Sequence, residues 1–164
     1  MSDYIMEMRK LVGHRPLLSV GASVIVKDER GRVLLQKRHD NGCWSYAGGA
    51  VELDERVEDA ARRELFEETG LVAGALEFFG VYSGPECHFS YPNGDEMSYV
   101  DIVYICRDWT GTLRPQPEEV DELRWFSLDA LPEPLSPPIR RQLLDWAAQK
   151  RQQAEGAGST PVSV

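Results

Sequence analysis

Apolar residues recur along the chain with two spacings, and short polar or glycine-rich stretches separate the segments. Helical periodicity predicts helices over 3–12, 55–69 and 138–152, and the first two end at Gly13 and Gly70, which suit helix C-caps. Runs rich in β-branched and aromatic residues predict strands over 18–27, 32–38, 76–82, 88–91, 97–106 and 123–126.

The turns between these strands predict how they pair. The turn 28–31 predicts a hairpin of the two strands on either side of it, and the Asn-Gly pair within 92–95 predicts a second hairpin. Together the elements predict an α+β fold, a sandwich of helices around a mixed twisted sheet. We expect one domain over 1–152, with 1–16 as an N-terminal helical extension and 153–164 as a disordered tail.

Composition narrows the class of protein. The 164 residues are 42% hydrophobic and 27% charged, values typical of one soluble globular domain. No apolar run approaches the ~20 residues of a membrane helix, and the N-terminus lacks the basic start and apolar stretch of a secretory signal. Three scattered cysteines indicate reduced thiols. We therefore expect a cytoplasmic protein without a membrane partner.

The formal net charge of −9 argues against nucleic acid as a partner, because the phosphate backbone repels an acidic chain. Much of the excess lies in 48–71, where Glu64, Glu67 and Glu68 continue the apolar stripe of the predicted helix instead of opposing it. Carboxylates at this spacing repel one another, and the C-terminal end of a helix disfavours negative charge. A divalent cation with oxygen ligands removes both problems, and Mg²⁺ suits few carboxylates together with substrate phosphates.

The same residues belong to a longer motif. The chain matches G-x5-E-x7-R-E-U-x-E-E-x-G-U, with U aliphatic, at every defined position from Gly49 to Leu71. This motif resembles the Nudix box, and the resemblance extends loosely over 18–150. It implies the Nudix α/β/α sandwich and Mg²⁺-dependent hydrolysis of a nucleoside diphosphate linked to another moiety, with Mn²⁺ as an alternative ion. A homodimer is compatible with it.

The resemblance also assigns roles to individual residues. It implies that Glu64, Glu67 and Glu68 ligate the metal, and that Glu55 completes the site directly or through water. Arg63 is implied to hold a glutamate in place by a charge-assisted hydrogen bond, the alternative being an exposed pair with Glu67. The resemblance implies that Arg38 contacts substrate phosphates, the alternative being an arginine in solvent at the edge of the sheet.

The base that deprotonates the attacking water is left open. Within the motif, Glu67 or Glu64 is a candidate for this base. Outside the motif the candidate is Glu119, whose position resembles that of an acidic residue that some family members use. The alternative for the acids around Glu119 is a solvated loop. Five aromatic residues are candidates for stacking on a nucleobase, although core packing is the more frequent role of aromatic residues beside strands: Trp44, Tyr82, Phe89, Tyr91 and Trp109.

The chain departs from the family pattern at two positions. Ala47 stands where proline usually precedes the Gly-Gly pair, and Asp54 stands in place of a glycine. Asp54 suits a left-handed backbone conformation or a helix cap. The substrate is left open between a nucleotide sugar such as ADP-ribose and a (deoxy)nucleoside triphosphate. A rival reading, a catalytically inactive nucleotide-sensing module, is disfavoured because every glutamate of the motif is present.

Overall fold

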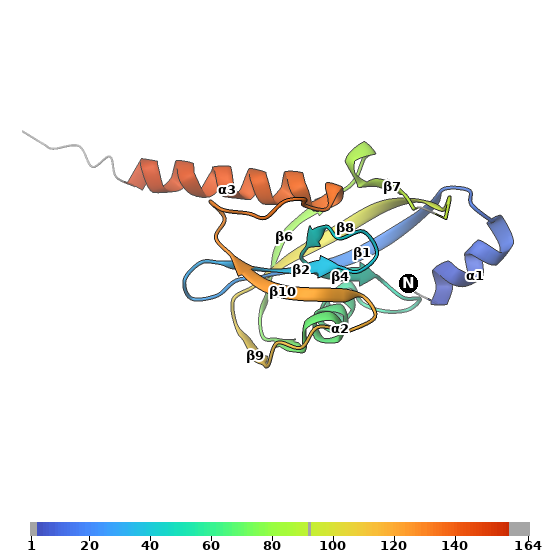
Figure 1. Cartoon of the computed structure of the whole chain (residues 1–164), viewed down its shortest axis with the longest axis horizontal. Coiled ribbons are helices and arrows are strands. Elements are labelled where there is room, and N and C mark those ends of the chain that lie inside the picture. Colours follow the sequence, from blue (N-terminus) through green and yellow to red (C-terminus); the bar gives the residue numbers. More distant parts are fainter. Residues whose placement is uncertain (1–2, 92, 158–164) are drawn as a thin grey trace, which may run out of the picture.

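The computed structural model describes residues 3–91 and 93–157. A mixed β-sheet occupies the centre, with α2 (Val57–Thr69) on one face and α3 (Pro137–Ala157) on the other (Figure 1). This arrangement confirms the predicted α+β sandwich. No helix in the described ranges is long and apolar enough to cross a membrane.

The central sheet has the strand order β4-β1-β8-β6. Its members are β4 (Ala47–Ala50), β1 (Leu17–Val26), β8 (Glu96–Cys106) and β6 (Leu76–Tyr82). The long neighbours β1 and β8 run parallel over ten residue pairs, whereas β4 and β6 pair antiparallel with them. The short strand β7 (His88–Ser90) also pairs antiparallel with β8, across the turn containing Asn93-Gly94, which confirms the second predicted hairpin.

The first predicted hairpin is wrong. After β1 the chain makes a single bridge, Lys27 to Val33, and β2 (Val33–Arg38) then enters a separate sheet between β10 (Val120–Phe126) and β3 (Trp44–Ser45). The physical reason is burial. The first four residues of β2 are buried on both faces, and pairing with β1 is not available because β8 and β4 already occupy both edges of that strand.

Gly70 ends α2 as predicted, in a left-handed conformation at φ 76°. A Cβ at this position would lie 2.7 Å from the Thr112 carbonyl oxygen, so the close approach also requires glycine. Directly after it, β5 (Leu71–Ala73) pairs with β9 (Trp109–Gly111). The helix is thereby fixed at its C-terminal end, the end that carries the glutamates.

The two faces of the central sheet carry separate cores. On β1, Ala22, Val24 and Val26 pack toward α2, whereas Ile25 packs toward α3. The α3 side is filled by Ile139, Leu143 and Trp146. On this α3 face, the N-terminal half of β1 carries the small side chains Ser19, Gly21 and Ser23 instead, and that half of the face forms the floor of a cleft.

Helix α1 (Asp3–Val12) is attached to the edge of this cleft. The buried Arg9 guanidinium donates to the Arg15 and Glu96 carbonyl oxygens at 2.6 Å each, and Ile5 lines the cleft. At the other terminus α3 extends to Ala157, past the predicted end at 152. The last seven residues of the predicted tail, 158–164, lie outside the described residues.

Candidate functional site

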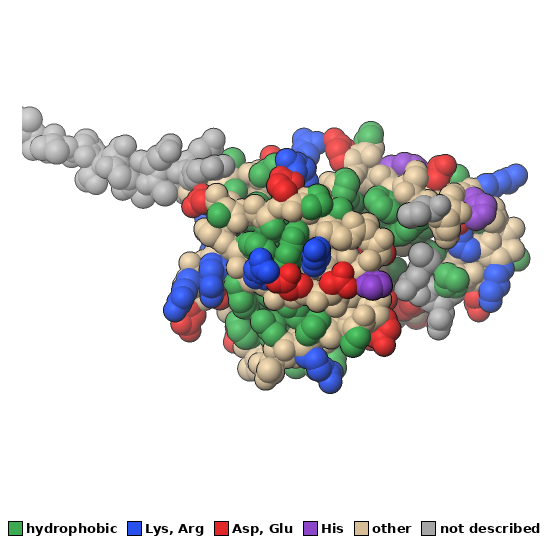
Figure 2. Space-filling view, in the orientation of Figure 1, with side chains coloured by type: hydrophobic (Ala, Val, Ile, Leu, Met, Phe, Trp, Pro, Cys, Tyr) green, Lys and Arg blue, Asp and Glu red, His purple; other side chains and the backbone are tan. Residues whose placement is uncertain are grey.

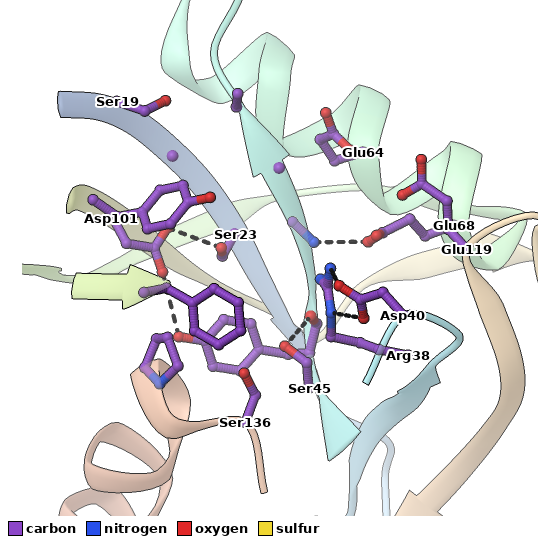
Figure 3. A pocket seen from close by; sticks show the side chains of 18 of the residues that line it. Ser19, Ser23, Arg38, Asp40, Ser45, Glu64, Glu68, Asp101, Glu119 and Ser136 are labelled. Carbon is purple, nitrogen blue, oxygen red and sulfur yellow. Dashed lines mark hydrogen bonds and ion pairs between the residues drawn. The ribbon is translucent and has the colours of Figure 1, made fainter. Parts of the chain in front are cut away.

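A cleft of about 1040 Å³ opens where α3 stops covering the central sheet. At one end lie Glu64, Glu68 and Glu119, with Arg38 and Asp40 beside them, and at the other end lie Asp101 and Ser23 (Figure 3). The two ends differ in composition. The first end joins several carboxylates to an arginine, whereas the second surrounds one carboxylate with hydroxyl and aromatic groups.

Glu68 is the most buried acid of the first end, with 3% of its surface exposed. Its carboxylate accepts hydrogen bonds from the Gly48 backbone N–H at 2.8 Å and from the Gln36 side chain. Burial nevertheless raises the pKa of Glu68 to about 8. The charged form is therefore short of compensation, which is the condition that a bound cation relieves.

Glu64 occupies space that a glycine leaves free. A Cβ at Gly49 would lie 2.4 Å from the Glu64 carboxyl carbon, so this glycine is needed for the carboxylate to reach the cleft. Burial also raises the pKa of Glu64, and the neighbouring Glu67 and Glu119 carboxylates contribute in the same direction. Burial thus disfavours the charged form of Glu64 as it does that of Glu68, although a hydrogen bond from Arg63 offsets part of this effect for Glu64.

Arg63 holds this end of the site together. Its guanidinium donates to both oxygens of Glu55 at 2.8 and 2.9 Å, and to Glu64 at 2.6 Å. The contact with Glu67 is longer, 3.4 Å. Arg63 therefore makes contacts of the kind that the resemblance implied, and its hydrogen bonds lower the pKa of Glu55. Both Glu55 oxygens thus accept hydrogen bonds from Arg63, which ties the loop that precedes α2 to the helix.

Glu64, Glu67 and Glu68 offer only carboxylate oxygens, which are the ligand atoms that hard divalent cations such as Mg²⁺ prefer. Glu64 and Glu68 are desolvated, and the neighbouring Glu67 side chain is 50% exposed. Within the described ranges, however, no three Asp, Glu, His or Cys side chains already form a closed metal-binding group. In this structure Glu64 accepts a hydrogen bond from Arg63, and Glu68 accepts one from Gly48.

Arg38 is the last residue of β2 and lines the cleft. It donates to both oxygens of Asp40, at 2.9 and 2.8 Å. Burial disfavours the charged form of Arg38, but the hydrogen bonds that Arg38 donates to Asp40 outweigh this effect and raise the pKa of Arg38. Arg38 is therefore a permanently charged group at the first end of the cleft, which we call the acidic end because Glu64, Glu68 and Glu119 lie there.

Glu119 also lines the cleft, on the loop before β10. The Glu119 carbonyl accepts from the His39 N–H at 2.9 Å, and its own N–H donates to Gln116 at 3.1 Å, so the backbone of this loop is fixed. The negative charge of the Glu119 side chain contributes to the raised pKa of Glu64. Glu118 lines the cleft too, whereas Glu122 forms an ion pair with Arg124 on β10 and does not line it.

The second end of the cleft was missed by the sequence reasoning. Asp101 on β8 accepts a hydrogen bond from the Ser23 hydroxyl at 2.9 Å, and the Tyr46 hydroxyl lies 3.4 Å from its other oxygen. Burial raises the pKa of Asp101 to about 6. The sequence does contain a signal for Asp101, because this acid interrupts the largely apolar strand 97–106. Gln36 interrupts the apolar strand β2 in the same way.

Two details of the motif are resolved. Asp54 has φ 62°, so it takes the left-handed conformation that a glycine would favour, and the residue preceding α2 is Arg56, which makes no side-chain cap. Of the aromatic candidates, Phe89 and Tyr91 line the cleft. Trp44, Tyr82 and Trp109 belong to or pack against the two cores, as the more frequent role predicts.

The chain resembles known proteins over most of its length. A family model described as "NUDIX domain" matches residues 17–147. The ADP-ribose pyrophosphatase of Methanocaldococcus jannaschii is 36% identical over 137 residues, 80% of this chain and 76% of the relative. The NAD-capped RNA hydrolase NudC of Pseudomonas aeruginosa is 35% identical over 79% of this chain, which spans only 44% of that relative.

A crystal structure of a MutT NUDIX hydrolase from Burkholderia pseudomallei superimposes with a TM-score of 0.68. The alignment has 33% sequence identity and covers 78% of this chain and 97% of that one.

Proposed function

Because this chain belongs to the Nudix family and is a pyrophosphohydrolase of that family, we propose that it hydrolyses the pyrophosphate bond of a nucleoside diphosphate linked to another moiety. The observation that carries the proposal is the convergence of Glu64, Glu68, Glu119 and Arg38 at one end of a single cleft. An arginine binds phosphate oxygens, and desolvated carboxylates bind the cation that accompanies a polyphosphate.

The substrate is a small nucleotide, either a nucleotide sugar such as ADP-ribose or a (deoxy)nucleoside triphosphate. The relative named ADP-ribose pyrophosphatase supports the first class. The relative named NAD-capped RNA hydrolase raises RNA as a substrate, but the net charge of −9 disfavours a long polyanion. Acidic and basic side chains are interleaved on the face in Figure 2, where they form no continuous basic band over the described residues.

Nudix hydrolases generally use divalent cations, and we propose Mg²⁺ here, with Mn²⁺ as the alternative. Glu64, Glu67 and Glu68 would hold the ion. When bound, the ion would supply charge neutralisation of the phosphate oxygens and a lowered pKa for the attacking water. Arg63 is a positioning residue in this scheme, since it fixes Glu64 and Glu55 by hydrogen bonds.

Two further groups at the acidic end have separate roles, Arg38 in binding phosphate and Glu119 in proton transfer. Arg38 binds the phosphate that faces β2, and Asp40 holds its guanidinium in orientation. Glu119 accepts the proton of the attacking water. It lines the same cleft as Glu64, and its charge contributes to the raised pKa of Glu64. Glu67 and Glu64 are the alternative bases.

A Gly49→Ala variant tests the position of Glu64. The added methyl group would overlap the Glu64 carboxylate, which lies at the end of a flexible side chain and yields more easily than backbone. We therefore expect kcat to fall at least tenfold while the melting temperature changes by only a few degrees. In a Glu64→Gln background the same substitution should add little further loss, since the two changes affect one group. Additive losses would show that Gly49 acts independently of Glu64.

The proposed function is tested by a metal-dependent hydrolysis screen. The full chain is incubated with ADP-ribose, (deoxy)nucleoside triphosphates, nucleotide sugars and dinucleoside polyphosphates, and the products are separated by chromatography. We expect at least one substrate to be cleaved with Mg²⁺ and none with excess chelator. Cleavage that persists in chelator would contradict the metal assignment, and a panel left intact under both conditions would contradict the function.

A further inference from the structure

We propose that Asp101, at the end of the cleft away from the glutamates, determines base preference by accepting two N–H donors from a guanine ring. The inference rests on the proposed function, because it assumes that the phosphates lie at the Arg38 end and that the rest of the nucleotide extends toward β8. It narrows both proposed substrate classes, the nucleotide sugars and the (deoxy)nucleoside triphosphates, to their guanine members, and it therefore disfavours ADP-ribose itself.

The first argument is that Asp101 lacks a cationic partner. Among the described residues, no Lys, Arg or His makes an ion pair with it, and its hydrogen bonds come from Ser23 and Tyr46, both neutral. Glu55, Glu64 and Asp95, by contrast, each pair with an arginine or a histidine. Burying a charged carboxylate destabilises a protein unless hydrogen-bond donors compensate for the lost water. We therefore infer that Asp101 accepts further hydrogen bonds from a bound ligand.

The second argument is that β1 leaves room above this carboxylate. Strand register places Ser19 beside Tyr99 and Gly21 beside Asp101 on the same face of the sheet. A Cβ at Gly21 would lie 3.1 Å from the Asp101 Oδ1 atom, so a larger side chain would crowd it. The small residues therefore keep the carboxylate accessible from the cleft.

The third argument is that flat aromatic groups surround the same end. Tyr99 precedes Asp101 by two positions on the same face of β8, and its hydroxyl makes a hydrogen bond of 2.7 Å with that of Tyr91. Phe89 packs edge-to-face against Tyr91, with ring centroids 4.7 Å apart. All three rings line the cleft. Aromatic walls around a carboxylate suit a planar ring that bears N–H groups.

The donor pattern selects the base. Both oxygens of an ionised carboxylate are acceptors, so the best ligand edge carries two adjacent donors. Guanine presents a ring N–H next to an exocyclic amino group. Adenine and cytosine place an acceptor nitrogen beside the amino group, and uracil flanks its ring N–H with carbonyl oxygens. Guanine is therefore the standard base whose edge complements Asp101.

The test is calorimetric binding of GMP, IMP and AMP to the full chain in chelator, where base recognition is measured without hydrolysis. IMP lacks only the 2-amino group of GMP. A hydrogen bond to a charged group contributes enough to change affinity roughly ten- to a hundredfold. We expect GMP to bind more tightly than IMP by that factor, and AMP to bind most weakly. Equal affinities of the wild-type protein for GMP and IMP would overturn the proposal without any variant.

The variant is Asp101→Asn, which keeps the shape and removes one acceptor oxygen. We expect its preference for GMP over IMP to fall to within about twofold, while its melting temperature stays equal or rises because a buried unpaired charge is removed. Asp101→Ser serves the same purpose if the amide misfolds. Asp28→Asn, in the turn after β1, is the matched control and should keep the wild-type preference. An Asp101→Asn protein with an unchanged ratio would overturn the assignment.

These outcomes are separable from those of the hydrolysis screen. A protein that hydrolyses nothing but shows the Asp101-dependent preference refutes the proposed function alone. A protein that hydrolyses guanine and hypoxanthine nucleotides equally refutes the base assignment alone.

Discussion

Replacing Glu68 with glutamine should lower kcat by roughly 10²- to 10³-fold. The amide keeps the size of the side chain but loses the negative charge, and a catalytic cation is worth several kcal/mol to the transition state, at about 1.4 kcal/mol per tenfold in rate. The buried carboxylate of Glu68 is the group at the acidic end with the least compensated charge. The measurement is steady-state kinetics at saturating Mg²⁺ on the best substrate of the screen.

Asp59→Asn is the matched control, since Asp59 is an exposed acid on the solvent side of the same helix. It should retain wild-type kinetics. Glu67→Gln should also lose more than tenfold, although Glu67 is half exposed. If the Glu68 and Glu67 variants each kept more than about a tenth of wild-type kcat, these glutamates would not be the metal ligands.

Replacing Glu119 with glutamine should lower kcat by about 10²-fold or more, the lower end of what loss of a general base costs. The reason is a division of labour, because a carboxylate that ligates a cation is a poorer base than one that does not. Glu119 lines the cleft on a loop whose backbone is fixed by His39 and Gln116. Metal affinity, measured by calorimetry with Mn²⁺, should stay nearly unchanged in this variant.

Glu118→Gln and Glu122→Gln are the controls for that prediction. Glu118 is the direct neighbour and also lines the cleft, whereas Glu122 is paired with Arg124 away from it. Both should lose much less activity than Glu119→Gln. If all three variants behave like the wild type, the base lies within the motif, and Glu67 or Glu64 takes the role.

The acidic end of the site could be predicted from the sequence because its signal is local. Glu64 and Glu68 lie on one helix, and helical spacing alone placed them on the packed side, where both are buried or mostly buried. The backbone of Asp54 was predictable for the same reason, since few residues tolerate a positive φ. Arg63 was placed by the motif, and its hydrogen bonds agree.

The failures arose where pairing or burial depends on distant segments. A polar turn between two β-rich runs predicted a hairpin, but β1 instead pairs with β8, some eighty residues later in the chain. The spacing of β1 and β2 contains no information about that partner. Strand register over such a separation is decided by which faces can be buried together, and both faces of β2 required cover.

Asp101 was missed for a related reason. Its neighbours along the chain are apolar, and the groups that define its environment come from β1 and from the segment around Tyr46. A polar residue in an apolar strand signals that something unusual occupies that position. Only the parallel register of β1 and β8 shows that it faces the same cleft as the glutamates.

The most direct test of the central claim is hydrolysis in ¹⁸O-enriched water, with the products examined by ³¹P NMR and mass spectrometry. If water attacks a phosphorus atom of a pyrophosphate, one phosphate-containing product carries a single ¹⁸O on phosphorus, and no labelled product forms in chelator. Label found only on a sugar carbon would mean cleavage of a glycosidic bond, and it would contradict the assignment of this cleft to pyrophosphate hydrolysis.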